Sequence, residues 1–405
     1  MSSLLIKNIG EIFTGKQSIP GDSILIDDGI IVQIGHIHTP RAESFLDAKG
    51  KTLIPGFIDC HTHLVFAGSR EFELDMKLKG ATYTDIAKMG GINYTVNLTQ
   101  KTSKKELFSQ AYKRLDAMLA HGTTTIEAKS GYGLNLETEI KILEVIKELN
   151  KKHPLDIIPT FMGAHAIPSD STPADYQRDI LDDMIPVVAQ KKLAKFCDVF
   201  CEKGYFTLEQ SQEILEKGKK YGLPPKIHAD ELTQYGGAEL AAKVHATSAD
   251  HLLCVSDKGI KDMVTADVTA VLLPATPFSL MEPYYAPARK MITQGLRVAL
   301  ATDLNPNCWT ESMQFVIQLA CYMMHMTPQE AITAATHNAA YALGISDIVG
   351  TIEPGKKADM VLLDCPSHIF LPYHFGVNLV SHVIKNGEII YPLKGKDSNS
   401  SLVFR

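Results

Sequence analysis

The feature that most constrains this chain is a long central region in which short apolar segments alternate with helical ones. Eight of these segments have the length and apolar content of buried strands, and stretches of helical periodicity such as Glu137–Leu149 and Leu208–Tyr221 separate them. Eight strand–helix units in succession predict a (β/α)8 barrel. The predicted strands are Phe57–His63, Thr123–Lys129, Asp156–His165, Ala194–Cys201, Pro225–Glu231, Thr247–Leu253, Val268–Pro274 and Val298–Asp303.

Both ends of the chain are instead rich in predicted strands. Ser23–Ile26 and Ile30–Gly35 flank an Asp-Gly turn, and the segment His382–Ile390 contains Asn-Gly, so each region predicts a β-hairpin. A single small β-sandwich built from both ends is the simplest packing. We therefore predict a composite sandwich of residues 1–55 and 355–405 around a barrel of residues 56–354.

The composition narrows the class of function. A net charge of −6, with no long basic run, makes nucleic acid or an acidic membrane surface an unsuitable partner. No apolar stretch approaches the ~20 residues that a spanning helix needs. The first residues lack the apolar core of a signal peptide, and seven scattered cysteines are typical of reduced thiols, so we expect a cytoplasmic protein.

Polar side chains end six of the predicted strands, and in such a barrel these ends meet at one rim. Taken singly, His165 or His251 could be a hydrogen-bonded histidine and Asp303 a turn cap. Lys129 could form an interior ion pair. Buried polar groups need partners, however, and so many on one rim favour a shared metal ion and substrate. The residues at these ends are His61, His63, Lys129, His165, His228, His251 and Asp303.

Three neutral imidazoles and one carboxylate would leave an open position on the ion, as in catalytic rather than structural sites. Such an ion lowers the pKa of bound water to about 7, which makes hydroxide available at neutral pH. Asp303 could accept the proton of that water. Glu231, three residues after His228, is placed to move protons to a leaving nitrogen, and His251 to polarise a carbonyl or orient the hydroxide.

Two segments give the chain a resemblance to the metal-dependent amidohydrolase superfamily over nearly its whole length. Pro55–His63 resembles the opening motif of that superfamily, and Gly350–Asp359 resembles its return into the sandwich. Within the superfamily the chain is most similar to the imidazolonepropionase family of histidine degradation. The segments that carry this similarity are Phe66–Glu73, Gly80–Tyr83, Glu127–Leu134, Phe161–His165 and Asp303–Pro306.

This resemblance implies a hydrolase that opens a cyclic amide at a C–N bond with metal-activated water. Its substrate would be 4-imidazolone-5-propanoate and its product N-formimino-L-glutamate. It implies a homodimer with one Zn2+ or Fe3+ ion per subunit. The implied metal ligands are His61, His63, His228 and Asp303. The implied substrate-binding residues are Arg70, Tyr83, Tyr132, His165, Glu231 and Asn305, and the implied catalytic residues are Glu231, His251 and Asp303.

The residue types suit such a substrate. A propionate tail needs a cation, and Arg70 offers a bidentate fork, although a surface ion pair with Glu71 or Glu73 is the alternative. Tyr83 and Tyr132 can stack on a flat ring, or simply pack. The chain departs from the family after the eighth strand, where Asn307 and Cys308 replace Gly and a hydroxyl residue. Both are retained as substrate-binding candidates through their backbone.

Two other functions stay open. Another amidohydrolase, such as a purine or pyrimidine deaminase, would also use His228 and Glu231, but its neutral ring gives Arg70 no role. A non-catalytic amidohydrolase-like scaffold is an alternative of a different class. Scaffolds tend to lose metal ligands, whereas this chain has all four.

Overall fold

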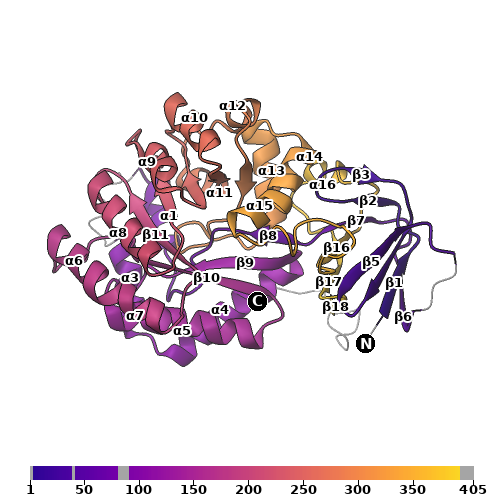
Figure 1. Cartoon of the computed structure of the whole chain (residues 1–405), viewed down its shortest axis with the longest axis horizontal. Coiled ribbons are helices and arrows are strands. Elements are labelled where there is room, and N and C mark those ends of the chain that lie inside the picture. The colour runs from indigo at the N-terminus through magenta and orange to yellow at the C-terminus, as the bar shows by residue number, and fades with distance from the viewer. Residues whose placement is uncertain (1–2, 39–41, 81–90, 393–405) are drawn as a thin grey trace.

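The computed structural model describes residues 3–38, 42–80 and 91–392. A strand-and-helix barrel forms the larger part, and a domain made only from segments near the two ends of the chain stands beside it (Figure 1). The predicted architecture of a (β/α)8 barrel with a β-sandwich is confirmed. No helix within the described ranges is both long and apolar enough to cross a membrane.

The barrel is an eight-stranded parallel sheet in which sequential strands are neighbours. Its ends meet beyond the last regular pairing, where Thr62 bridges to Leu304 and the His63 amide donates to the Leu304 carbonyl at 2.9 Å. The strands are short and buried, as parallel strands covered on both faces must be. They are β8 (Phe57–Asp59), β9 (Thr123–Lys129), β10 (Asp156–Ala164), β11 (Phe196–Cys201), β12 (Lys226–Ala229), β13 (Ser248–His251), β14 (Thr269–Leu272) and β15 (Val298–Leu300).

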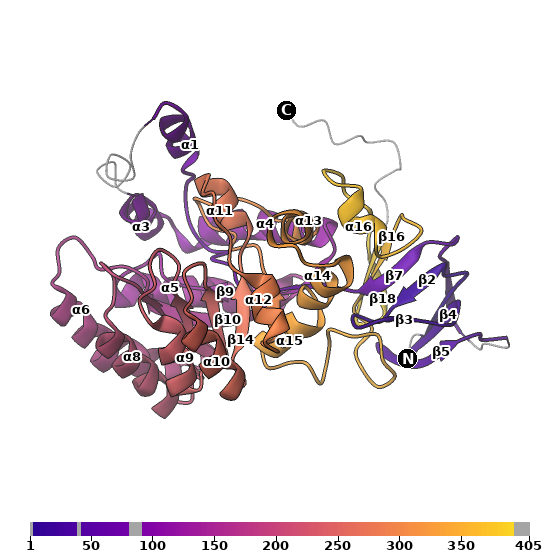
Figure 2. The same ribbon diagram turned by 90° about the horizontal axis from the view of Figure 1, so that it is seen from above.

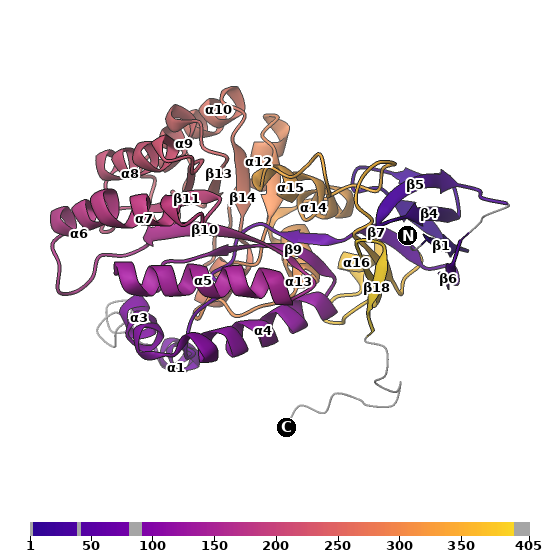
Figure 3. The same cartoon turned by 60° about the horizontal axis from the view of Figure 1, so that its bottom comes forward.

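Helices cover the outside of the barrel, with α4 and α5 lying along β9 and β10 (Figure 3). Two others, α1 and α3, project from the barrel on the side that also carries α11 (Figure 2). The helices are α1 (Glu71–Leu78), α3 (Gly91–Lys101), α4 (Lys104–Ala120), α5 (Leu136–Lys152), α6 (Pro173–Asp179), the π-helical η1 (Ile180–Met184), α7 (Ile185–Gln190), α8 (Leu208–Lys220), α9 (Gly237–Val244), α10 (Asp257–Thr265), α11 (Ala275–Leu280), α12 (Ala288–Thr293), α13 (Met313–Met324), α14 (Pro328–Ala334), α15 (His337–Ala342) and α16 (Phe370–Tyr373).

Two sheets form the terminal domain, and strands from both ends of the chain share the larger one. That sheet has the order β18-β17-β16-β7-β2-β3, and the smaller one has the order β5-β4-β1-β6. Isoleucines and leucines between them make a separate apolar core. The strands are β1 (Ser3–Lys7), β2 (Glu11–Phe13), β3 (Ser18–Ile19), β4 (Ser23–Asp27), β5 (Ile30–Gly35), β6 (Ser44–Asp47), β7 (Thr52–Pro55), β16 (Met360–Leu363), β17 (Val380–Lys385) and β18 (Glu388–Tyr391).

Both predicted hairpins are present, and the backbone conformation of their two-residue turns favours them. Asp28 and Gly29 between β4 and β5 have φ of 48° and 78°, and Asn386 and Gly387 between β17 and β18 have φ of 49° and 78°. Positive φ at both central residues is the type I′ geometry, which matches the twist of the flanking strands.

The predicted first barrel strand is too long. Regular pairing stops at Asp59, whose carboxylate accepts hydrogen bonds from the amide and hydroxyl of Thr302. The chain then passes between the ends of β9 and β15, and the Asp303 amide donates to the His61 carbonyl. His61 and His63 therefore follow the strand rather than alternate along it, yet both stay buried at the rim.

The chain enters the barrel through Gly56, where it passes close to β9. An added Cβ at Gly56 would lie 2.3 Å from Thr124 Oγ1 and 2.4 Å from its Cγ2. We predict that Gly56→Ala lowers the free energy of unfolding by about 1–3 kcal/mol, because the clash is with a buried side chain. Denaturant titration would measure it. Thr124→Ala removes the two nearest atoms, so the double variant should lose less than the sum of the single variants; strict additivity would contradict the steric explanation.

Candidate active site

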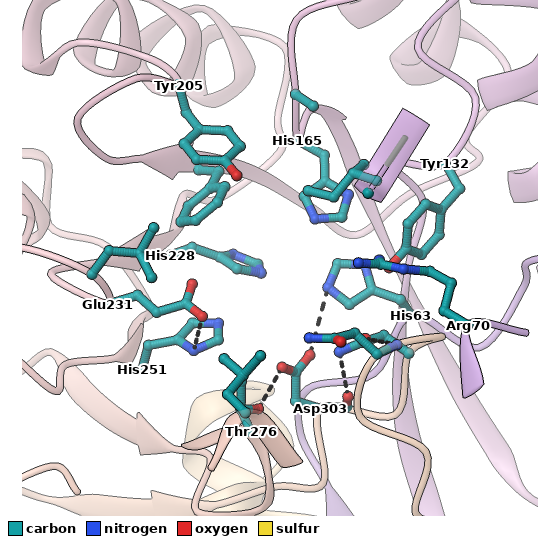
Figure 4. Close-up of a pocket in the computed structure, with 18 of the residues that line it drawn as sticks. His63, Arg70, Tyr132, His165, Tyr205, His228, Glu231, His251, Thr276 and Asp303 are labelled. Carbon is teal, nitrogen blue, oxygen red and sulfur yellow. Dashed lines mark hydrogen bonds and ion pairs between the residues drawn. The ribbon is translucent and has the colours of Figure 1, made fainter. Parts of the chain in front are cut away.

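A pocket of about 370 Å³ opens at the carboxyl ends of the barrel strands. His228, Glu231 and His251 form one wall, Arg70, Tyr132 and His63 form the facing wall, and Asp303 lies beside Thr276 (Figure 4). This placement follows from parallel strands, since all their carboxyl ends meet at one rim. The chain also brings α1 and the start of α3 to the mouth of the pocket, through Arg70, Glu73, Lys77, Gly91, Ile92 and Asn93.

His61, His63 and Asp303 lie close together at the rim. Asp303 Oδ1 lies 3.4 Å from His61 Nε2 and 3.8 Å from His63 Nε2. Thr276 donates its hydroxyl to the other oxygen of Asp303 at 2.7 Å, which holds the carboxylate in place. Burial raises the pKa of Asp303 to about 6, so this group takes up and releases protons near neutrality.

His228 approaches His61 from the end of β12. The ring centroids of His61 and His228 lie 4.5 Å apart. Two groups able to hold a cation share His61: one adds His63 and Asp303, and the other adds His228 and His251. Burial holds the pKa of His61, His63 and His228 well below the usual value, which favours the neutral imidazole that a metal requires.

The donor atoms fit a metal ion. His61 Nε2 and His228 Nε2 are buried and have no hydrogen-bond partner among the described residues. A buried polar atom without a partner costs free energy, whereas coordination would satisfy it. Imidazole nitrogens with one carboxylate are a ligand set that both zinc and iron accept.

A carboxylate stands behind each of two histidines. Asp250 Oδ2 lies 2.6 Å from His61 Nδ1, and Asp198 Oδ1 lies 3.2 Å from His228 Nδ1. Each carboxylate accepts the Nδ1 proton, which fixes the tautomer and leaves the Nε2 lone pair for the pocket. Sequence reasoning missed both aspartates. The available signal was an acidic residue in the otherwise apolar β11, and another directly before His251 in β13.

Lys129 joins these carboxylates within the barrel. Its ammonium lies 2.6 Å from Asp198, 3.1 Å from Glu127 and 3.4 Å from Asp250. Lys226 contacts the second oxygen of Glu127 at 2.7 Å. Burial alone would lower the pKa of Lys129, but the three carboxylates raise it above its usual value, so Lys129 stays protonated. The interior ion pair considered from the sequence is therefore present, and Lys129 does not line the pocket.

Glu231 and His251 lie together in the pocket wall. Glu231 Oε1 lies 3.5 Å from His251 Nδ1. Burial, reinforced by Asp303 and Glu202, raises the pKa of Glu231 to about 8, so this carboxyl group holds a proton at neutral pH. Glu202 also positions the loop after Glu231, because it accepts the amide and hydroxyl protons of Thr233.

Arg70 has a partner that the sequence left open. Its Nε and Nη2 donate to the two oxygens of Glu73 at 2.7 and 2.8 Å. The sequence had suggested a surface ion pair as the alternative role of Arg70. The pair is present, but it is buried in the pocket wall. Arg70 Nη1 takes part in neither bond. Near it, the rings of Tyr132 and His165 lie 5.2 Å apart, and His165 stacks on His63 at 4.7 Å.

The loop after β15 brings some predicted residues to the pocket and not others. Asn305 and Asn307 line the pocket, and the Asn305 side chain accepts the amides of Asn307 and Cys308 at 2.8 and 3.0 Å. The Cys308 side chain is buried, with Sγ 3.6 Å from the Thr302 carbonyl, and it does not line the pocket. Tyr83 falls outside the described residues.

Several lining residues had no clear sequence signal. Phe200 and Tyr205 come from the end of β11 and the loop after it, and Thr276 comes from α11. None of these residue types is diagnostic of a site, and only the folded barrel brings them to the same rim. Lys77 also had no clear sequence signal; it adds a second positively charged side chain, besides Arg70, at the mouth of the pocket.

Comparisons with known proteins agree with this geometry. The profile described as the Amidohydrolase family matches residues 52–390. The chain is 51% identical to an imidazolonepropionase of Geobacillus kaustophilus, with 92% of this chain and 90% of that protein covered. It is 48% identical to an imidazolonepropionase of Alkaliphilus metalliredigens, with 93% and 90% covered.

Solved structures share the fold at lower identity. A 5-methylcytosine deaminase from Klebsiella pneumoniae liganded with 5-fluorocytosine superposes with a TM-score of 0.74 at 15% identity, with 95% of this chain and 97% of that chain covered. A Xaa-Pro dipeptidase with bound methionine superposes with a TM-score of 0.70 at 20% identity, with 96% and 99% covered.

We predict that Lys129→Met destabilises the protein by about 3–5 kcal/mol and weakens metal binding, because it leaves buried carboxylates without their cation. Denaturant unfolding and metal titration of the stripped protein would measure the two effects. Lys152→Met is the matched control, since Lys152 pairs with Glu148 on the exposed face of α5. If Lys129→Met behaves like this control, the buried cluster has no part in stability or metal binding.

Proposed function

The chain belongs to the amidohydrolase family and, within it, to the imidazolonepropionases, and we propose from this membership that its pocket hydrolyses 4-imidazolone-5-propanoate. The bond cleaved is the ring C–N amide bond, and the product is N-formimino-L-glutamate in histidine degradation. The observation that carries the proposal is one pocket that holds both a histidine–aspartate cluster and, on the facing wall, an arginine. The cluster suits amide hydrolysis, and the arginine suits an acidic tail.

The proposed metal ligands are His61, His63, His228 and Asp303. Their support is the convergence of buried donor atoms described above, and the ion is Zn2+ or Fe3+. When bound, the ion supplies Lewis acidity and makes hydroxide available at neutral pH. Asp250 and Asp198 would hold His61 and His228 in the orientation that coordination needs.

The remaining polar groups move protons during the hydrolysis. Water adds its oxygen to the ring carbonyl carbon, the C–N bond breaks, and the ring nitrogen gains a proton. Asp303, the carboxylate beside His61 and His63, is the proposed acceptor of the proton from water. Glu231, with a pKa of about 8, carries a proton at neutral pH and is the proposed donor to the nitrogen. His251 would stabilise the charge that develops on the carbonyl oxygen.

The substrate ring and tail are assigned to the facing wall. Tyr132 and His165 are proposed to contact the ring, and Arg70 Nη1 the carboxylate of the tail. Asn305 would act mainly by shaping the loop, and Asn307 by lining the pocket. Tyr83 and Cys308 remain proposals, Cys308 through its backbone alone.

The alternatives make different predictions for a turnover assay. A deaminase would release ammonia from a neutral purine or pyrimidine and leave the imidazolone intact, and Arg70 would then have no ligand to bind. The likeness to the Klebsiella deaminase shows the fold alone. A non-catalytic scaffold would neither bind a metal ion nor turn over substrate after zinc or iron is added. Turnover of the imidazolone with bound metal would exclude both.

The wider organisation is also proposed. A boundary at residues 55–56 is supported by β7, which ends at Pro55, and by β8, which begins at Phe57; the return near residue 355 is supported by the pairing of β16 with β7. A homodimer is supported by the exposed rings of Tyr322 and Phe375, whose centroids lie 5.8 Å apart. A cytoplasmic location rests on the cysteine usage.

We predict that His251→Ala lowers kcat at least about 100-fold while bound metal stays near one ion per chain, because His251 acts on the carbonyl rather than as a ligand. Steady-state kinetics and elemental analysis of the same sample would measure both. Loss of the ion together with activity would instead make His251 a ligand, as the group it forms with His61 and His228 allows.

We predict that Arg70→Ala raises KM for the imidazolone by about tenfold or more with a smaller change in kcat, because its contact with the tail exists before the transition state. The single change also leaves Glu73 as an unpaired buried carboxylate. The control is therefore Arg70→Ala with Glu73→Ala, which should recover stability but not KM. An unchanged KM in both variants would remove Arg70 from the binding of the tail.

A further inference from the structure

The mouth of the pocket contains a positively charged side chain, Lys77, that has no role in the substrate contacts proposed above. Arg70 and Glu73 form a bidentate pair, so their charges cancel and an approaching carboxylate meets both signs. The Glu73 side chain is only 2% exposed, which holds the pair out of solvent. A pair of this kind can orient an anionic tail through Arg70 Nη1, but it does not balance the charge of that tail.

Lys77 lies on the same face of α1, one helical turn beyond Glu73. Residues three or four apart on a helix are neighbours, so α1 presents Arg70, Glu73 and Lys77 to the pocket as a row. Lys77 Nζ donates to Asn307 Oδ1 at 3.4 Å, which is a long contact to a neutral acceptor from the loop after β15. Lys77 thus connects α1 to the loop after β15 across the mouth of the pocket.

The ammonium of Lys77 is half-buried and has no carboxylate within ion-pair distance in the part of the chain that the structure describes. Burial lowers its pKa, and Glu73 and Glu282 act on it only at longer range. A partly desolvated cation without an anionic partner is stabilised when a carboxylate binds beside it, because the new ion pair offsets the hydration lost on burial.

We infer that Lys77 is a specificity-determining residue that balances the charge of the substrate's carboxylate tail, while the Arg70–Glu73 pair orients that tail. The inference rests on the proposed function for the identity of the tail. Both residues lie at α1, so this helix would set the preference for an acid over a neutral analogue. Arg70 would orient the carboxylate, and Lys77 would supply the net positive charge.

The test compares an acid with its neutral amide. Lys77→Met keeps the length of the side chain and removes its charge, and Lys77→Arg keeps the charge. With Lys77→Met, KM for 4-imidazolone-5-propanoate should rise about tenfold, the change produced by ~1.4 kcal/mol, with little change in kcat. The KM for the corresponding propanamide should not change. Lys77→Arg should restore most of the affinity for the acid.

A binding measurement makes the result independent of turnover. Isothermal titration with imidazole-4-propanoate and its primary amide should show that Lys77→Met weakens the acid selectively. The matched control is Lys79→Met, because Lys79 is exposed near the end of the same helix and pairs with Asp75 away from the pocket. This control should leave both probes unchanged.

Equal weakening of acid and amide, or unchanged binding of the acid, would overturn the role of Lys77. The proposed function fails separately: wild-type protein would then leave the imidazolone intact. If that protein still bound the acid probe in a Lys77-dependent way, the charge-balancing role would stand without the proposed reaction.

Discussion

The buried charge cluster inside the barrel is the constraint on which the rest of the site depends. Lys129 and Lys226 lie among Glu127, Asp198 and Asp250 with no exposure to solvent. Burying such charges is expensive unless each finds a close partner, and here the contacts are mutual. The formal excess of one negative charge faces His61 and His228, which is the environment in which a coordinated cation is most stable. Metal affinity and barrel stability are therefore parts of one electrostatic arrangement.

The pocket above this cluster has two regions with different physical tasks. The region over β8, β12 and β15 collects neutral imidazoles and a carboxylate, and its depth raises the pKa of Asp303 and Glu231 towards neutrality. The region under α1 collects fixed charges: the buried Arg70–Glu73 pair and the half-buried Lys77. Because α1 follows the first strand in the chain, the segment that supplies two histidines also supplies the arginine and the lysine of the mouth. The segment from β8 to α1 therefore carries both proposed metal ligands and residues proposed to bind the substrate tail.

Much of the fold and of the site was predictable, because the signals are local. Alternating strand and helix patterns predicted the barrel, and two Asp-Gly or Asn-Gly turns predicted the hairpins. The first barrel strand was overestimated: the prediction extended it to His63, whereas its regular pairing ends at Asp59. The pairing of Arg70 with Glu73 was considered but placed on the surface, because burial of a helix face near a pocket depends on segments far away in the chain.

What the sequence determined by itself was the set of reactive groups and the rim on which they gather. That follows because a strand's carboxyl end is a local property and parallel strands bring such ends together. Only the tertiary structure decided which groups touch: Asp250 behind His61, Asp198 behind His228, Lys129 among three carboxylates, and Lys77 opposite Asn307. These contacts join residues that are distant in the chain, and their energies depend on burial, which no local pattern specifies.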